Sequence, residues 1–231
     1  MNVASDKGIA LVVALIALVV MTAWGATLVL TTTSDTLIAA SFRDGRELFY
    51  AADAALARVV VELSHVADWN GVLDGSVRSA LVDGPSTVRR TLPDGSAVDL
   101  DQVASRASCG KPVCAMADLT RTTAARPWGT NNPVWRLYAH GRPIDMLATG
   151  TLDSPEYVVV LVADDPSEND GNPMRDGATA ANPGSGIIGL RAEAFGPRRA
   201  YRVIEMTIWR AAEPEATGSA APRVLSWRER R

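Results

Sequence analysis

Histidine and cysteine are scarce in this chain, which has two of each among 231 residues. A structural zinc site takes four nitrogen or sulfur ligands, and His65 and His140 lie far apart in the sequence, so a zinc centre is not expected. The net charge of −3 gives no reason to expect a nucleic-acid partner. The G-x-S-x-G, H-E-x-x-H and P-loop patterns are absent from the sequence. We therefore predict that the protein is not an enzyme, has no catalytic residue and requires no cofactor.

Charge is missing altogether from one long stretch near the N-terminus, Ile9–Leu30. About 20 apolar residues in a helix cross the ~30 Å hydrocarbon core of a bilayer. A secretory signal has a shorter apolar core, of roughly 7–15 residues, followed by a small-residue cleavage site. The run in this chain is longer, and Thr31–Asp35 is a poor cleavage site. We therefore predict a retained transmembrane helix half over residues 9–34.

The helical pattern continues beyond Asp35 as a seven-residue repeat. Asn70–Gly71 is the expected end of this amphipathic half, residues 35–70, because glycine tolerates the left-handed conformation at a helix end. This repeat places a seam of apolar or small residues along one face of the helix. The seam is consistent with a helix that packs on the chain's own domain. It is equally consistent with a helix whose first half packs on other subunits and whose second half packs on its own sheet. Its apolar or small residues form two series, which are Phe42, Phe49, Leu56 and Leu63, and Gly45, Ala52, Val59 and Val66.

The rest of the chain is predicted to be rich in β-strands that pair antiparallel, because tight turns join neighbouring strands. The predicted class is α+β, with a long N-terminal transmembrane and amphipathic helix packed on an antiparallel β-sheet head over residues 71–210. Residues 211–231 are predicted to be a flexible tail, with Arg223–Arg231 as its basic, solvated end. The predicted strands are Val88–Leu92, Ala97–Leu100, Val134–Ala139, Glu156–Val162, Gly186–Phe195 and Ala200–Trp209.

The two cysteines, Cys109 and Cys114, lie close together in the sequence. A close pair in an exported domain is typical of a disulfide that closes a small loop. Two free thiols, or half of a metal site, are the alternatives.

An acidic loop follows the predicted strand that ends at Val162. Calcium takes 6–8 oxygen ligands, often from a loop that contains glycine turns. The loop does not follow the EF-hand pattern, since Gly171 would place Pro166 at the first ligand position. A polar loop of ordinary turn-forming residues is the alternative. The candidate calcium ligands are Asp164, Asp165, Glu168, Asp170 and Asp176, with Asn169 and Asn172 as further oxygen donors.

Several N-terminal motifs carry a family resemblance. Lys7-Gly8, directly before the apolar helix, resembles the end of a type IV prepilin leader, which is cut after the glycine. The stretches Gly8–Thr22, Thr31–Asp35 with Ala39–Arg46, and Phe49–Leu56 resemble the start of PilX-type minor pilins, relatives of the tip pseudopilins. In that family a Thr/Ser-rich patch is followed by an Asn-Leu-Arg-Asp-like turn of helix and a Phe-x-Ala-Ala-Glu-Ala-Ala-Leu-like stretch.

The resemblance implies that residues 1–8 are a leader, which prepilin peptidase removes between Gly8 and Ile9. Ordinary pilins carry a glutamate at the fifth position of the mature chain, and that position here is Val13. In the family this glutamate meets the N-terminal amine of the neighbouring subunit, and the pairing offsets the cost of a carboxylate in lipid. A subunit without the glutamate suits the tip of a fibre, as in the tip pseudopilins of type II secretion.

The function that the resemblance implies is that of a minor pilin, a structural subunit that primes or caps assembly of a type IV pilus. Its implied partners are other minor and major pilins through the N-terminal helix, prepilin peptidase, the inner membrane and a tip adhesin. The implied location is the cytoplasmic membrane with the head in the periplasm, and then a pilus or pseudopilus at the cell surface. The alternatives are a tip pseudopilin of a type II secretion system and a membrane-anchored binding or sensor domain.

Overall fold

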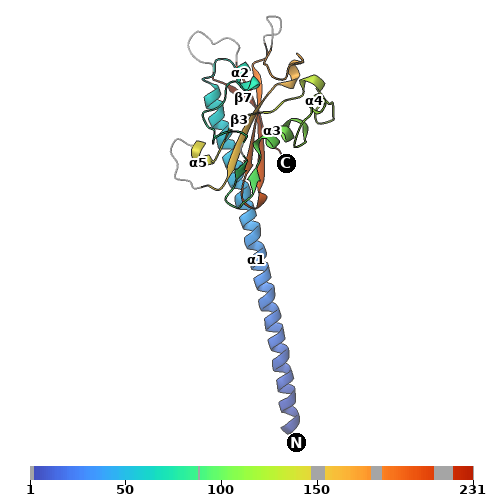
Figure 1. The fold of residues 1–231 in the computed structure, drawn as a ribbon. Coiled ribbons are helices and arrows are strands. Elements are labelled where there is room, and N and C mark those ends of the chain that lie inside the picture. The colour runs from blue at the N-terminus through green and yellow to red at the C-terminus, as the bar shows by residue number, and fades with distance from the viewer. Residues whose placement is uncertain (1–2, 88, 147–153, 178–183, 211–220, 231) are drawn as a thin grey trace. The chain divides into compact units, whose positions relative to one another are not determined.

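The computed structural model describes residues 3–87, 89–146, 154–177, 184–210 and 221–230 (Figure 1). Contacts divide the chain into two compact units, Met1–Arg43 and Asp44–Arg231. The helices are α1 (Val3–Leu63), α2 (Asn70–Asp74), α3 (Leu100–Cys109), α4 (Met116–Leu119) and α5 (Pro143–Met146). The strands are β1 (Arg90–Thr91), β2 (Ala97–Val98), β3 (Arg136–Gly141), β4 (Tyr157–Asp164), β5 (Ile187–Phe195), β6 (Tyr201–Trp209) and β7 (Arg223–Arg230), and the short 3-10 helices are η1 (Gly129–Asn131), η2 (Pro166–Glu168) and η3 (Pro197–Arg199).

The first unit consists of the N-terminal part of α1. Every large apolar side chain from Ile9 to Phe42 is exposed, with exposed fractions between 44% and 72%. By length and composition, this helix is able to cross a membrane. A long apolar helix at the N-terminus, as the sequence predicts, is therefore confirmed.

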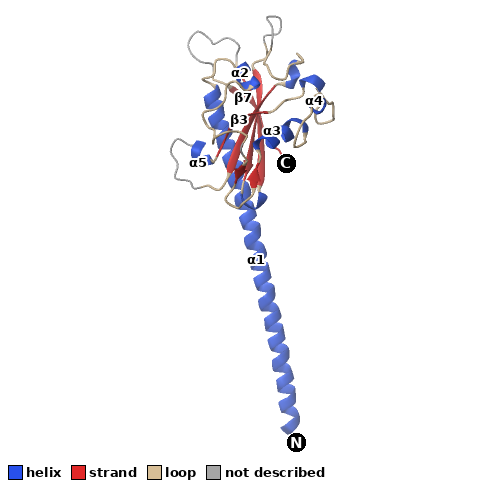
Figure 2. Ribbon diagram, viewed as in Figure 1, coloured by secondary structure: helices blue, strands red, loops and turns tan. Residues whose placement is uncertain are grey.

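The second unit, which we call the head, is built on an antiparallel sheet of five strands in the order β3-β4-β5-β6-β7. Figure 2 shows these strands in red beside the C-terminal part of α1. Strand order in the sheet equals chain order, so each strand pairs with its neighbours in sequence. The pairing is long in the middle of the sheet, where Ala192 lies opposite Val160 on β4 and Ile204 on β6. The predicted α+β class and the β5–β6 hairpin are confirmed.

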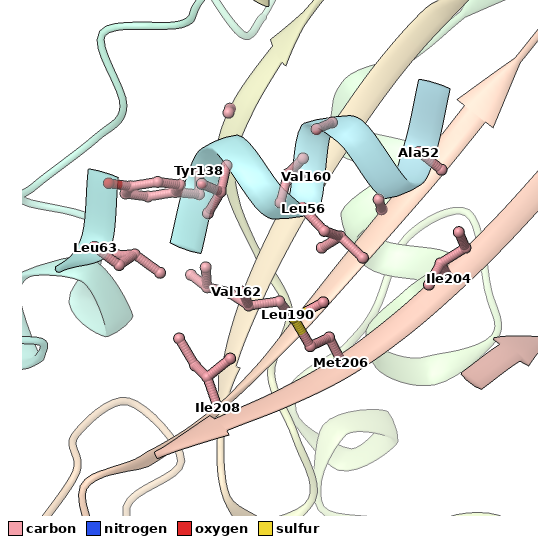
Figure 3. Close-up of a cluster of buried hydrophobic side chains, with 14 of the residues drawn as sticks. Ala52, Leu56, Leu63, Tyr138, Val160, Val162, Leu190, Ile204, Met206 and Ile208 are labelled. Carbon is pink, nitrogen blue, oxygen red and sulfur yellow. The ribbon is translucent and has the colours of Figure 1, made fainter. Parts of the chain in front are cut away.

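One face of the sheet packs against the last turns of α1 and forms the main core (Figure 3). The seam prediction holds here, since Ala52, Leu56, Val59 and Leu63 are all at most 1% exposed. The buried stripe is wider than the predicted seam, because a helix that lies on a broad sheet buries flanking positions as well. These additional buried residues are Leu48 and Ala55, and the sheet residues beneath the helix include Val160, Val162, Leu190, Ile204, Met206 and Ile208.

Strand β4 is buried on both faces along its whole length. Its other face, which includes Val159 and Leu161, packs against Leu100 and Val103 of α3. Burial on both sides explains why this strand is a continuous apolar run and lacks the alternation of a half-exposed strand. The sequence pattern did not predict α3. The predicted strand Ala97–Leu100 is wrong at its end, since Leu100 begins this helix.

The face of the sheet that packs against α3 at β4 carries a cluster of charged side chains over β5, β6 and β7. The cluster is centred on Glu205, which is 9% exposed. Glu205 accepts hydrogen bonds from Arg191 Nη1 at 2.8 Å and from Arg228 Nη2 at 2.6 Å. Arg191 Nε also donates to Glu193 at 2.6 Å, and Arg230 Nε lies 3.3 Å from Glu205. The charges are therefore paired across three strands.

The predicted end of the long helix at Asn70–Gly71 is wrong, since α1 ends at Leu63 and Asn70 begins α2. Trp69, 1% exposed, folds back so that its indole Nε1 donates to the Leu63 carbonyl at 3.2 Å. The indole adds a second donor to this carbonyl at the end of the helix, which also accepts from Val66 N at 3.2 Å. Glycine at position 71 allows a close approach instead, because a Cβ there would meet Val77 Cγ2 at 2.8 Å.

The prediction of a flexible tail is wrong for its last part, because Arg223–Arg230 forms β7 and pairs with β6. The strand is held by side chains as well as by its backbone. Trp227 donates to Asp53 at 3.0 Å and stacks edge-on with Phe49, with 5.7 Å between ring centroids. Charged side chains on an edge strand are a common protection against unwanted strand pairing, which is why the basic composition was misread.

The other predicted strands are present in the structure, with different first or last residues. The first hairpin is confirmed in the short antiparallel pair β1–β2, with Thr91 opposite Ala97, although Val88, its predicted first residue, lies outside the described residues. Strand β3 begins at Arg136 and continues to Gly141, two residues beyond its predicted end at Ala139.

Candidate functional site

Gly8 and Ile9, the predicted processing site, both lie within α1. An added Cβ at Gly8 would meet nothing within 4 Å, and Ile9 is 62% exposed. Val13, at the position where the resemblance expects a glutamate, is 60% exposed on the same helix. The predicted cleavage position is thus free of other contacts in the described chain.

Threonine hydroxyls in the N-terminal half of α1 donate hydrogen bonds to backbone carbonyls of the same helix. Thr27 donates to the Ala23 carbonyl at 2.8 Å, and Thr31 donates to the Thr27 carbonyl at 2.8 Å. Thr33 makes the same bond to Val29 at 2.7 Å. Because these hydroxyls need no water, the Thr-rich patch is compatible with a membrane boundary.

The head brings together three of the five predicted metal ligands. Asp164 is the last residue of β4, Glu168 ends η2, and Asp176 lies further along the loop that leads to β5. One ligand oxygen from each of the three carboxylates lies within 4.8 Å of the others. We call this group the carboxylate triad.

Backbone amides of the loop hold two members of the triad in place. Glu168 accepts from Gly177 N at 3.1 Å and from Ser185 N. Asp176 Oδ1 accepts from Gly186 N at 3.0 Å. These bonds tie the end of the loop to its beginning.

Asp165 and Asp170 lie outside the triad. Asp165 caps η2, where its carboxylate accepts from Ser167 N at 3.1 Å and from Ser167 Oγ at 2.5 Å. Asp170 Oδ1 accepts from Asn172 N at 2.8 Å. Both follow the side-chain turn pattern that the polar-loop alternative expected. The acidic loop therefore contains both features, turn-forming residues and a converging group.

Close packing of the triad perturbs its protonation. Burial, and then the charge of Glu168, raise the pKa of Asp164 to about 9. Burial and a hydrogen bond to Glu168 raise the pKa of Asp176 to about 7. Burial opposes ionisation of Glu168 too, but hydrogen bonds from Ser185 and from Asp176 bring its pKa below the ordinary value. At neutral pH three full negative charges are therefore not favoured here without a compensating positive charge.

The structure joins Cys109, at the end of α3, to Cys114 in a disulfide with an S–S distance of 2.03 Å. The bridge closes a short loop before α4. Nearby, Arg126 donates to the carbonyls of Asp118 and Leu119 at 2.9 and 2.7 Å. The disulfide and Arg126 together hold the α4 segment.

The two histidines are not brought together. His65 lies just after α1, with its Nδ1 2.9 Å from the Val61 carbonyl. His140 is 2% exposed, and its Nδ1 lies 3.0 Å from the Tyr157 hydroxyl, which in turn accepts from Arg90 Nε at 3.2 Å. Because Arg90 can only donate, the Tyr157 hydroxyl keeps its own hydrogen available for an unprotonated His140 Nδ1.

Stability of the head is expected to fall at acid pH because of His140. Burial, and then the charge of Arg90, lower the pKa of His140, with Arg78 acting in the same direction and Asp83 opposing. The unfolded chain, whose histidine titrates near ~6.5, then binds a proton that the folded chain resists. Stability is therefore present above about pH 6.5 and is lost as pH falls below it, by at most ~1.4 kcal/mol per pH unit for one group.

The measurement is the free energy of unfolding of the wild type and of His140→Gln between pH 7.5 and 5. The variant should lose less stability over this range than the wild type does. His65→Gln, which removes the exposed histidine, is the matched control and should leave the loss in place. Equal pH dependence of His140→Gln and the wild type would contradict the prediction.

Comparison with protein-family models decides the nature of the N-terminal segment. Residues 7–57 match the family described as PilX N-terminal. The N-terminal segment is similar to that of PilX-type pilins. The resemblance stated from the motifs is thereby confirmed, and this match connects the chain to type IV pilus minor pilins, which are structural subunits. No curated protein and no solved structure matches the chain.

The PilX-type match begins at Lys7 and includes both Gly8 and the buried helix residues as far as Leu56. It ends within α1, so the sheet, the disulfide and the carboxylate triad all lie outside it. The match therefore bears on the N-terminal helix and not on the sheet of the head.

Proposed function

We propose that this PilX-type chain is a minor pilin that primes or caps assembly of a type IV pilus. The observation that carries the proposal is the match of residues 7–57 to the PilX N-terminal family. The matched segment lies in a helix whose large apolar side chains from Ile9 to Phe42 are all exposed. Exposed apolar side chains in such number need either lipid or other helices around them. A pilin subunit uses both environments in turn.

The physical basis of assembly is an exchange of lipid contacts for helix contacts. In the bilayer the apolar helix is surrounded by acyl chains, and in a filament by the helices of other pilins. Helices approach closely where small residues line the interface, and this segment contains Ala14, Ala17, Ala23, Gly25 and Ala26. Other minor and major pilins are the partners that such a helix would meet.

Val13 favours the tip of the filament over its shaft. A subunit in the shaft would gain from a carboxylate that pairs with the N-terminal amine of its neighbour, since a charged amine in an apolar bundle is costly when unpaired. This chain offers valine at that position. A tip subunit lacks the neighbour whose amine would need the pairing, so the substitution costs it nothing.

We place the head in the periplasm and the helix in the cytoplasmic membrane before assembly. The disulfide between Cys109 and Cys114 supports this orientation, because such bonds persist in oxidising compartments. Prepilin peptidase would act on the Gly8–Ile9 bond at the other side of the membrane.

Processing provides the test of this function. The wild-type chain from cells with an active prepilin peptidase should begin at Ile9 by mass spectrometry and should be present in purified filaments in small amounts. Gly8→Leu should leave the chain beginning at Met1 and absent from filaments, because the expected cut follows this glycine. A Cβ at position 8 would meet nothing within 4 Å, so loss of a packing contact is not expected.

Ala4→Leu, a substitution within the leader and away from the cleaved bond, is the control and should be processed normally. A wild-type chain that still begins at Met1 would overturn the proposal. If the processed chain is found in secretion pseudopili and not in pili, the alternative of a tip pseudopilin holds.

A further inference from the structure

We propose that Asp164, Glu168 and Asp176 bind one calcium ion, which ties the end of β4 to the loop that returns to β5. This inference goes beyond pilus assembly and concerns the head alone. Calcium–oxygen distances are about 2.3–2.6 Å, so two oxygens on opposite sides of one ion lie up to ~5 Å apart. The triad oxygens, all within 4.8 Å of one another, fit around a single ion of this size.

A second observation points to a ligand independently of the clustering. Asp164 is 4% exposed, and its Oδ1 is buried without any hydrogen-bond partner. A buried carboxylate oxygen that is left unpaired is costly, and native structures rarely tolerate one. Asp164 belongs to the triad, and a cation among the three carboxylates would give this buried carboxylate a partner of opposite charge.

The chemistry of the donors selects calcium among common cations. All three side chains offer carboxylate oxygen, and the metal-ligand group of the described residues contains no histidine or cysteine, which zinc would favour. Calcium accepts irregular sets of oxygen ligands and completes them with backbone carbonyls and water. Magnesium demands a smaller, near-octahedral shell and loses its water reluctantly.

A cation at the triad would join parts of the head that are separate in sequence. Asp164 belongs to β4 and lies opposite Ile188 of β5 in the sheet. Asp176 N donates at 2.9 Å to the Asn70 side chain at the start of α2. Neutralising the triad would therefore stabilise the β4–β5 end of the sheet together with its contact to α2.

The rival occupant is a proton. Asp176 and Glu168 hydrogen-bond to each other, so a shared proton could also relieve their repulsion without any metal. The two cases differ in one respect, because only a metal site responds to calcium at constant pH.

The test is calorimetric titration of the full chain in detergent micelles with Ca²⁺ and with Mg²⁺ at pH 7.5, together with melting curves with and without a chelator. The wild type should bind one Ca²⁺ per chain and melt at a higher temperature with Ca²⁺. Asp164→Asn should weaken Ca²⁺ binding at least tenfold, since it removes one of three ligand charges. Asp165→Asn removes the same charge one residue later, outside the triad, and should bind Ca²⁺ within about threefold of the wild type.

Asp176→Asn is the second ligand variant, and circular dichroism checks that each variant folds. Three results would each overturn the proposal: no binding by the folded wild type, equal weakening by Asp164→Asn and Asp165→Asn, or equal affinity for Mg²⁺. None of them bears on processing at Gly8, so failure of the ion site and failure of the pilin function are distinguishable.

Discussion

Leu56→Ala is expected to lower the free energy of unfolding of the head by about 2–5 kcal/mol, the range for a leucine truncated in a packed core. Leu56 is 0% exposed and belongs to the cluster between α1 and the sheet, where Figure 3 shows it beside Val160 and Leu190. The cost has two parts, namely the loss of apolar burial and the cavity that remains. A rigid sheet beneath the helix leaves little room for collapse, which places the effect toward the upper part of the range.

Val61→Ala on the same helix is the matched control, since Val61 is 52% exposed. It should change stability by less than about 0.5 kcal/mol. The measurement is urea unfolding of the full chain in detergent, followed by tryptophan fluorescence, because Trp69 belongs to the same core. Similar losses for the two variants would show that the last turns of α1 are not packed on the sheet.

Glu205→Gln is expected to destabilise the head by about 3 kcal/mol, because it leaves the Arg191 guanidinium, whose side chain is 16% exposed, without a full counter-charge. Glu205 receives Arg191 on one oxygen and Arg228 on the other. The glutamine amide offers one acceptor in place of two and turns an NH₂ toward donors. The effect stays at the low end for a broken buried pair, since the Arg228 side chain is 63% exposed and can turn to water.

Glu229→Gln is the control with the same chemistry in an open setting. Glu229 pairs with Arg202 at 3.4 Å, and the two side chains are 30% and 45% exposed. Exposed pairs contribute about 0–1 kcal/mol, so this variant should differ little from the wild type. If both variants lose the same stability in urea, or neither loses any, the cluster around Glu205 is not a buried network.

The parts of the fold that were predictable are those with strong local patterns. The charge-free run from Ile9 to Leu30 allows hardly any structure but a helix, because backbone groups in lipid have to bond within their own segment. The hairpin of Gly186–Phe195 and Ala200–Trp209 was found to within a residue at each end, since its turn residues and branched strands agree.

The errors come from residues whose role depends on distant partners. Arg223–Arg230 has the composition of a solvated end, and it becomes a strand because Glu205, Asp53 and Phe49 receive its side chains. Helix α1 ends before Asn70 because Trp69 enters the core and bonds to the Leu63 carbonyl. Neither partner set is visible from the local sequence.

The candidate ion site shows the same division. Composition indicated that the acidic loop offers oxygen ligands, and five carboxylates qualified equally. The loop path then separates them, because Asp165 and Asp170 bond to nearby backbone amides while Asp164, Glu168 and Asp176 converge. Spacing along an irregular loop does not determine direction in space, so this selection could not be made from the residues alone.

The amino-acid sequence by itself determined the apolar stem, its PilX-type motifs, the α+β class and the order of the main strands, because these depend on periodicity and composition over short windows. Only the tertiary structure decided where α1 ends, that Arg223–Arg230 completes the sheet, and which carboxylates meet. Those features arise from contacts between residues far apart in the chain, and each such contact is selected by the free energy of the whole packed head.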